Sequence, residues 1–453
     1  MKTKKTICIL TAVMLCAAML LSAGCASKPK TQSGSINNGG TSDDNGSTLN
    51  GSVVDGKIKY SDGVIGGRTD YSEEFPISDY AIGGIEKRKD SVGYTYDGIA
   101  EAVGDYDISS GMPYVVEPGH SIDSQITAGT LTAGAIRDLD DLGNWIDLWE
   151  EQDWSNIRKT RGLYADNIIY VKVSPLTAVT LSDNDTVVYS AVSDIYGKAA
   201  LVFPDKYRDQ ELTLAYGQTK TAVKCTSAKV YELESEVQAV NAAKLDLMLM
   251  IDTTGSMGDE LEYIKVELKD MIARVRAEQN IDIRLSVNFY RDEGDEYVVK
   301  YYDFRGDIDE CVEIMSEQYA SGGGDYPEAV HTAINNVLQH NWRDDAVKLC
   351  FFVLDAPPHA ESEIQGINAD MIRDVTAMAK AGIRYIPVVS SGADVEVESL
   401  MRSFAAMTGG TYIFLTNHSG IGGDHQTPTD TQYEIEPLND CMVRVIKDYL
   451  FAK

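Results

Sequence analysis

Closely spaced cysteines are absent from this sequence of 453 residues, and so is any cysteine and histidine spacing typical of zinc or redox sites. Three of the seven cysteines fall within the first 25 residues. Whether one disulfide forms among the others in an oxidising compartment stays open. We interpret those four as small buried hydrophobic residues, because they lie far apart in apolar or helical contexts: Cys225, Cys311, Cys350 and Cys441.

Basic side chains are scarce in this chain. It carries 40 of them against 70 acidic side chains, which gives a formal net charge of -30. Such a surface repels the phosphates of nucleic acids and anionic lipid headgroups, so we expect neither as a direct partner. The same charge would concentrate divalent cations around the protein.

The N-terminal apolar run, ICILTAVMLCAAMLL, is shorter than the about 20 residues that a membrane-spanning helix needs. It follows the basic residues MKTKK and precedes LSAGC, which is the order of a secretory signal peptide. LSAGC resembles the bacterial lipobox, in which the cysteine becomes the lipidated N-terminus; Ala23, Gly24 and Cys25 fit, and Ser22 is less usual than leucine. We therefore expect a signal peptide over 1–24 and lipidation of Cys25. The protein would be exported and anchored to the outer face of a bacterial cell membrane through its lipid only; an uncleaved membrane anchor is the alternative.

The length of the chain predicts two or three domains. Residues 25–57 are rich in Gly, Ser, Asn and Thr, and we expect a disordered tether because they offer almost no apolar surface to bury. Residues 58–126 show no clear period, so we predict an irregular region and assign it no function. Residues 127–165 have Ala, Leu and Trp at helical spacings, with Trp145 and Trp149 four positions apart. We interpret them as a helical segment that packs as a cap, with an interaction patch as the alternative.

Residues 166–228 alternate between apolar and polar side chains, with turn signals every several residues. This pattern predicts a small β-sandwich. The stretch TVVYSAVSDIYGKAALVFP is similar to Ig-like modules of surface proteins that resemble carboxypeptidase regulatory domains. The resemblance implies a spacer or a binding module.

Residues 240–453 alternate apolar strands with amphipathic helices, which predicts an α/β fold with a doubly wound, mainly parallel sheet. The strands are continuously apolar, as expected where helices cover both faces of the sheet. Residues 297–304 suit an antiparallel edge strand. The expected strands cover 245–251, 283–290, 347–354, 383–389 and 411–415, and the expected helices cover 257–275, 308–319, 327–340, 368–381, 395–407 and 434–451.

Oxygen-bearing side chains follow the predicted strands at the edge where ligands bind in such sheets. Carboxylates and hydroxyls without His or Cys suit a hard cation, Mg²⁺ or alternatively Mn²⁺ or Ca²⁺. Without a cation, like charges at one place would repel one another. The candidate ligands are Asp252, Thr254, Ser256, Asp325 and Asp355, with Asp292 as a contact behind them or through water.

These motifs resemble those of the von Willebrand factor A family over residues 245–450. The family's metal-ion-dependent adhesion site begins Asp-x-Ser/Thr-x-Ser after the first strand, which matches Asp252, Thr254 and Ser256 within DTTGSM. DAPPH resembles the later Asp motif and corresponds to Asp355. GGGDYPEA and YRD resemble a bacterial and hemicentin-like subgroup, in which Asp325 takes the place of the usual metal-site Thr.

The resemblance implies that these residues hold a cation with one coordination position open for an Asp or Glu of a partner protein. We expect a non-enzymatic surface protein that binds an extracellular protein or matrix ligand in this way. A negative charge at Asp325 would weaken the pull on that partner. An exported metal-dependent hydrolase is one alternative, with His359 as the only candidate base, and a scaffold with a purely stabilising ion is another.

Overall fold

The computed structural model describes residues 52–54, 57–59 and 126–453, apart from 235, 279–280 and 430–432. The predicted signal peptide, Cys25 and most of the predicted tether and irregular region lie outside the described residues. The predicted tether is wrong at its end, where β1 (Ser52–Val54) pairs antiparallel with β2 (Lys57–Lys59). In the described part of the chain, no helix is long and apolar enough to cross a membrane.

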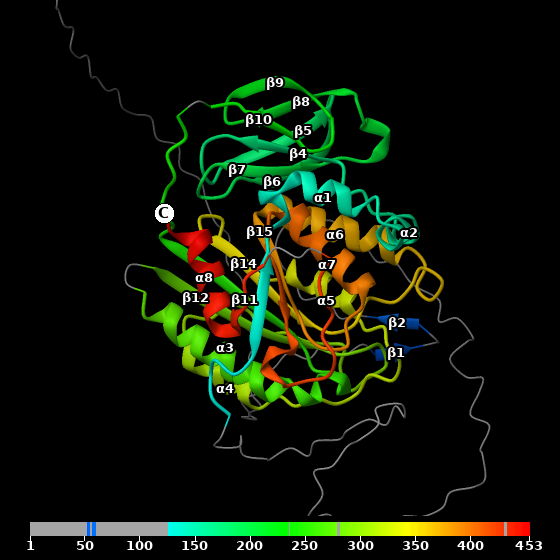
Figure 1. The fold of residues 1–453 in the computed structure, drawn as a ribbon, viewed down its shortest axis with the longest axis vertical. Helices are drawn as coiled ribbons and strands as arrows, with labels where there is room; N and C mark the ends of the chain where they lie inside the picture. Colours follow the sequence, from blue (N-terminus) through cyan, green and yellow to red (C-terminus); the bar gives the residue numbers. More distant parts are fainter. Residues whose placement is uncertain (1–51, 55–56, 60–125, 235, 279–280, 430–432) are drawn as a thin grey trace, which may run out of the picture. The chain divides into compact units, whose positions relative to one another are not determined.

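A central sheet of eight strands organises the C-terminal part of the described chain (Figure 1). Its strand order is β13-β12-β11-β14-β15-β16-β3-β17. The five middle strands run parallel to one another, and the strands at the two edges pair antiparallel. The α/β, mainly parallel fold is therefore confirmed. The parallel strands are β11 (Lys244–Asp252), β12 (Asp282–Tyr290), β14 (Val347–Leu354), β15 (Ile383–Val389) and β16 (Tyr412–Leu415), and the others are β13 (Val299–Lys300), β3 (Thr132–Ile136) and β17 (Glu436–Pro437).

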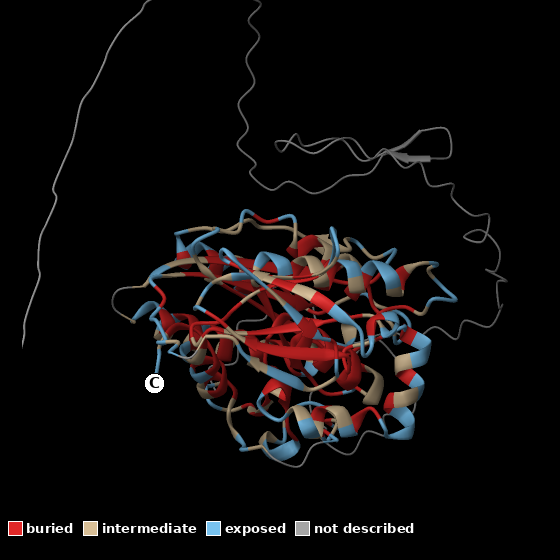
Figure 2. Ribbon diagram, turned by 90° about the horizontal axis from the view of Figure 1, so that it is seen from above, coloured by how far each residue is buried: buried red, intermediate tan, exposed pale blue. Residues whose placement is uncertain are grey.

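Helices cover both faces of this sheet, which explains why its strands are continuously apolar and buried (Figure 2). Met248 and Met250 of β11 pack with α5, α6 and α7, whereas Leu247 and Leu249 pack with α3, α4 and α8. The cysteines at 225, 311, 350 and 441 are free and buried, as predicted. The helices are α3 (Leu261–Arg276), α4 (Ile308–Ser316), α5 (Val330–Val337), α6 (Ile367–Ala381), α7 (Val395–Thr408) and α8 (Leu438–Leu450).

The helical prediction for residues 127–165 is wrong at its start, where β3 joins the central sheet instead. Gly134 of β3 allows this, because a Cβ atom there would lie 2.4 Å from the Phe414 ring of the neighbouring strand β16. Helices follow as predicted at α1 (Leu142–Leu148) and α2 (Gln152–Arg161). The Trp145 and Trp149 rings are buried and pack edge to face at 5.4 Å, which agrees with a packed cap.

Two small sheets are formed by the residues between β3 and β11. The four-stranded sheet is antiparallel, as predicted. In the three-stranded sheet, β4 pairs antiparallel with β7 but parallel with β10, which lies beyond the predicted end at residue 228. The strands are β5 (Ala178–Asp183), β6 (Thr186–Val192), β8 (Glu211–Tyr216) and β9 (Thr219–Lys224) in the first sheet, and β10 (Lys229–Glu232), β4 (Ile168–Lys172) and β7 (Lys198–Val202) in the second.

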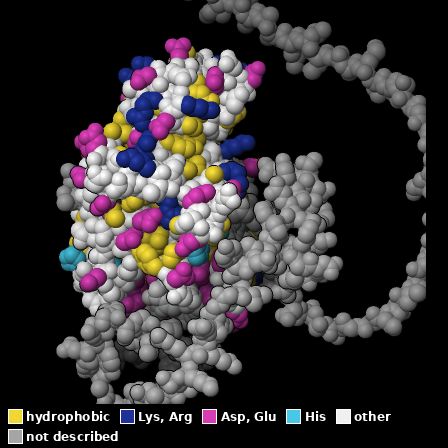
Figure 3. All heavy atoms as spheres, turned by 90° about the vertical axis from the view of Figure 1, so that its right-hand side faces the viewer, with side chains coloured by type: hydrophobic (Ala, Val, Ile, Leu, Met, Phe, Trp, Pro, Cys, Tyr) yellow, Lys and Arg dark blue, Asp and Glu magenta, His cyan; other side chains and the backbone are white. Residues whose placement is uncertain are grey.

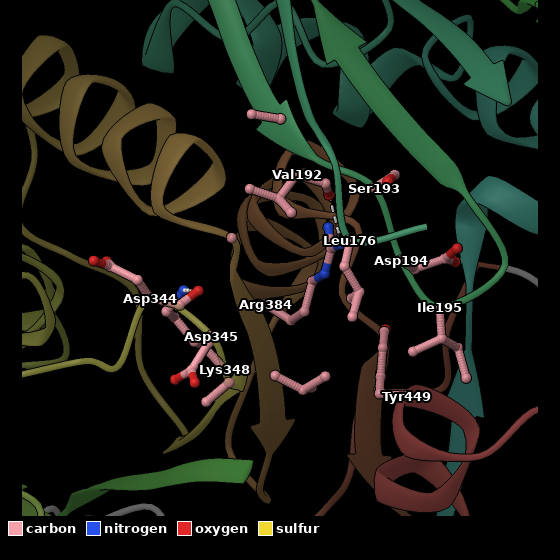
Figure 4. Close-up of a pocket in the computed structure, with 14 residues that line it drawn as sticks. Leu176, Val192, Ser193, Asp194, Ile195, Asp344, Asp345, Lys348, Arg384 and Tyr449 are labelled. Atoms are coloured by element: carbon pink, nitrogen blue, oxygen red, sulfur yellow. Dashed lines mark hydrogen bonds between the residues drawn. The ribbon is translucent and has the colours of Figure 1, made fainter. Parts of the chain in front are cut away.

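A cavity of about 460 Å³ lies where the small sheets meet the first residues of β14 and β15 (Figure 4). The buried Arg384 guanidinium donates to the carbonyl oxygens of Val192 (2.7 Å) and Thr408 (2.6 Å). The buried Lys348 ammonium donates to Ala381 O at 2.9 Å. Because backbone carbonyls bind both cations, we interpret this region as a structural junction.

The surface of the described chain is not uniformly acidic. On the face shown in Figure 3, most of the Lys and Arg side chains lie over the small sheets, among some Asp and Glu, while the charged side chains of the described surface below are mainly Asp and Glu. The acidic part of this face belongs to the half of the molecule that contains the central sheet. Divalent cations would therefore concentrate there.

Candidate metal centre

Asp252 is the last residue of β11, and its side chain is fully buried. The strand ends there because the Asp252 carboxylate closes a turn: its Oδ1 accepts from Thr254 N at 2.8 Å and from Thr254 Oγ1 at 2.6 Å. Oδ2 is buried and has no hydrogen-bond partner. Burial and then the charge of Asp292 raise the pKa of Asp252 to about 6, although the bonds from Thr254 and the nearby Tyr290 hydroxyl act in the opposite direction. A buried carboxylate oxygen without a donor is the state expected of a cation ligand.

Asp355 comes directly after β14, the parallel neighbour of β11. The register pairs Ile251 with Val353, so the two strands deliver their aspartates to the same edge of the sheet. Asp355 is buried, and its Oδ1 also lacks a partner. Burial and then the charge of Asp252 raise the pKa of Asp355 well above its ordinary range. The predicted convergence of Asp252 and Asp355 is therefore present in the structure.

The two predicted hydroxyls lie between these carboxylates. Thr254 Oγ1 and Ser256 Oγ are 3.2 Å apart, and Ser256 donates to Asp355 while Thr254 donates to Asp252. A short 3₁₀ turn, Gly255–Asp259, places them before α3 begins at Leu261. Each aspartate thus has one hydroxyl beside it.

Glu328 is the acidic group that the sequence analysis missed. Its side chain is buried, and its Oε2 has no hydrogen-bond partner. Burial, followed by the charges of Asp252, Asp292 and Asp355, raises the pKa of Glu328 to about 10. Carboxylates that raise one another's pKa in this way lie close together. The motif held a signal for this residue, since Glu328 directly precedes the apolar start of α5 and is therefore carried towards the core.

Asp325, which the sequence analysis predicts as a ligand beside Asp252, has His359 and Glu363 as neighbours in the structure. It is exposed, and its carboxylate lies instead with the side chains of His359 and Glu363, all three ligand atoms within 4.8 Å of one another. The loop turns at Gly322 and Gly323, both at positive φ. A Cβ atom on Gly323 would lie 3.0 Å from Glu328 Oε1, so the chain folds with Glu328 inwards and leaves Asp325 outside.

Asp292 lies close to the cluster. It is buried, accepts from His359 Nε2 at 2.8 Å, and contributes to the raised pKa of Asp252 and of Glu328. Asp295 Oδ2 accepts from the backbone amides of Asp292 (3.2 Å) and Gly323 (2.8 Å), so one side chain ties two of the loops together.

The arrangement fits a hard divalent cation. Among the described residues, no Lys or Arg side chain forms an ion pair with Asp252, Asp355 or Glu328. Burying several carboxylates without a compensating positive charge costs free energy. Each of the three has one buried oxygen without a donor, and hydroxyl oxygens lie beside them. An oxygen-only set of this kind suits Mg²⁺, Mn²⁺ or Ca²⁺.

Comparisons with known proteins agree with this geometry. Residues 246–417 match the family model of the von Willebrand factor A domain. An ariadne-like RING finger protein of Acanthamoeba polyphaga mimivirus is 28% identical over 191 residues, which cover 39% of this chain and 18% of the relative. The alpha-protein kinase vwkA of Dictyostelium discoideum is 25% identical over 173 residues, which cover 38% of this chain and 27% of the kinase. The chain thus spans less than a third of the length of either relative. Residues 246–417 of this chain are a von Willebrand factor A domain.

Proposed function

We propose that this domain binds one divalent cation and, through it, a carboxylate side chain of a partner protein. Asp252, Asp355 and the hydroxyls of Thr254 and Ser256 would hold the cation, with Glu328 beside them. The observation that carries the proposal is the set of three buried carboxylates, each with an oxygen that has no donor and no basic side chain paired to it. The cation would supply a positive charge that an Asp or Glu of the partner can approach.

We propose that the domain is a binding module and not a hydrolase. A hydrolase would need a base beside the cation to take a proton from water. The His359 imidazole is engaged through Nε2 with Asp292 Oδ1.

We also propose that the protein acts outside the cell, bound to the membrane through a lipid on Cys25, and that its partner is an extracellular protein or matrix component. The support is the signal-peptide pattern and LSAGC in the sequence. Metabolic labelling with a fatty-acid probe tests the anchor. Wild type should incorporate the label, and Cys25→Ser should not; equal labelling of both would contradict the anchor without bearing on the cation site.

Isothermal titration calorimetry with Mg²⁺, Mn²⁺ and Ca²⁺ tests the cation site. Wild type should bind one ion and Asp252→Asn should bind none, whereas Asp309→Asn, a change at an exposed residue paired with Arg276, should bind as wild type. Binding to a purified candidate partner should then require the cation, be reversed by EDTA and be lost in Asp252→Asn. Equal partner binding with and without EDTA would overturn the proposed function.

A further inference from the structure

A second group of potential ligands lies beside the first, where the loop containing Asp325 meets the loop that follows β14. The two loops are joined by the backbone: Glu328 N donates to Pro357 O at 3.0 Å, and Glu328 forms a β-bridge with Pro358. Arg161 of α2 holds the second loop by donating to Pro358 O at 2.9 Å and to His359 O at 2.6 Å. Both loops are thus fixed by contacts outside the group itself.

Three side chains converge there. One ligand atom each of Asp325, His359 and Glu363 lies within 4.8 Å of the other two. The His359 ring is buried, whereas Asp325 and Glu363 are exposed. Among the described residues, the Asp325 carboxylate has neither a hydrogen-bond donor nor an ion-pair partner. It faces the His359 ring and the Glu363 carboxylate.

The orientation of His359 indicates what this group binds. Asp292 Oδ1 lies 2.8 Å from His359 Nε2, so Nε2 carries the proton and donates it to that carboxylate. Nδ1 faces the exposed carboxylates and contacts Glu363 Oε2 at 3.3 Å, a contact that a cation at Nδ1 would replace. Metal-binding histidines are typically held in this way: a carboxylate accepts from one ring nitrogen, which leaves the lone pair of the other for the metal. Asp292 lies outside the three-residue group, so it is an independent indication of a ligand at Nδ1.

We propose that Asp325, His359 and Glu363 bind a second divalent cation, of the borderline transition-metal class to which Zn²⁺ belongs. One imidazole nitrogen and two carboxylates suit such ions better than Mg²⁺, which prefers oxygen alone. With three protein ligands, the ion would keep one coordination position for water or for a group of a partner. Because Asp292 contacts His359 and also lies behind Asp252, this ion would sit at the rim of the first cation site. The proposal does not depend on whether the first site binds a partner.

Titration of the full-length protein with Zn²⁺ in excess Mg²⁺ tests this site. The Mg²⁺ fills oxygen-only sites and screens the acidic surface, so only a nitrogen-containing site should still bind Zn²⁺ tightly. Asp325→Asn and Glu363→Gln change exposed side chains and should leave the fold intact, which circular dichroism verifies. Each should weaken Zn²⁺ binding by more than about tenfold, the lower end of what loss of even an outer partner costs. Glu361→Gln is the matched control, since its carboxylate lies on the same loop but accepts from Gly366 and Asn368.

The outcomes separate the two sites. Zn²⁺ binding that is weakened in both Asp325→Asn and Glu363→Gln, and kept in Asp252→Asn and Glu361→Gln, supports the second site. Wild-type affinity for Zn²⁺ in either of the first two variants overturns it. Loss of Zn²⁺ binding in Asp252→Asn alone also overturns it, because the ion would then occupy the first site. Failure of Mg²⁺ to bind at Asp252 would contradict the proposed function and leave the Zn²⁺ result unaffected.

Discussion

Replacing Glu328 with glutamine should stabilise the cation-free protein and reduce the stabilisation that Mg²⁺ provides. The side chains have the same shape, so Oε1 keeps its place beside Gly323. The amide replaces Oε2, which has no donor in the structure, and offers two N–H groups to a region of carboxylates. The substitution therefore removes the titrating carboxyl without leaving a cavity.

The magnitude follows from the raised pKa of Glu328. Its ordinary value is 4.5 and its value in the folded protein is about 10. At pH 7 the folded carboxyl holds a proton that the unfolded one has lost, which costs about 3 kcal/mol. Glutamine needs no proton, so Glu328→Gln should gain up to about that amount; this is an upper bound because the shift is shared with neighbouring carboxylates. The gain should shrink as pH falls towards 4.5, since both states of the wild type then bind the proton.

Urea unfolding at pH 7, with EDTA or with saturating Mg²⁺, measures both effects. In EDTA, Glu328→Gln should unfold at a higher urea concentration than wild type. With Mg²⁺, the wild type should gain about 3 kcal/mol at a hundred times the dissociation constant, and the variant should gain less because a negative charge is gone. Glu317→Gln, at an exposed position, should match wild type in both conditions.

Two results would refute this reasoning. If Glu328→Gln is less stable than wild type in EDTA, the side chain makes a contact that the neutral isostere cannot replace. If Mg²⁺ stabilises the variant as much as the wild type, Glu328 does not lie at the cation.

Three further predictions concern separate parts of the protein. Asp252→Asn should abolish the rise in melting temperature that Mg²⁺ causes, and an undiminished rise would place the ion elsewhere. Burial lowers the pKa of His340 from 6.5 to about 4, so the unfolded state binds more protons between these values and stability should fall by about 2 kcal/mol from pH 7.5 to pH 5. His340→Gln should flatten that pH profile, and an unchanged profile would assign it to other groups. Arg384→Met should cost about 2–5 kcal/mol in urea unfolding, because it leaves the buried carbonyls of Val192 and Thr408 without donors; a smaller loss would show that the junction relaxes.

Local sequence patterns were enough to predict most of the parallel sheet and most of the side chains at the cation site. Largely apolar runs place β11 and β14 because helices bury both faces of the sheet, and the charged residues lie near the ends of these strands. Asp252, Thr254 and Ser256 lie in a single turn, so their mutual position depends only on the chain around them. Asp355 follows because parallel strands end at a common edge of the sheet.

Non-local contacts decided the remainder. β3 pairs with β16, far away along the chain, and the short stretch TAGAI carries no period that distinguishes a strand from a helix. The edge strand predicted over 297–304 is shorter, with only Val299–Lys300 paired to β12, because little of it finds a partner backbone.

The sequence by itself does not determine whether Asp325 or Glu328 enters the cluster of carboxylates. The sequence determined that an acidic loop follows three glycines and meets the end of a buried strand. Only the tertiary structure decided which carboxylate enters the cluster, because the turn at Gly322 and Gly323 and the bridge from Glu328 to Pro358 depend on the neighbouring loop. Those contacts turn Glu328 inwards and leave Asp325 beside His359 and Glu363. The residue types determine which ligand chemistry is possible, and the packing of the loops against one another determines which side chains come together to provide it.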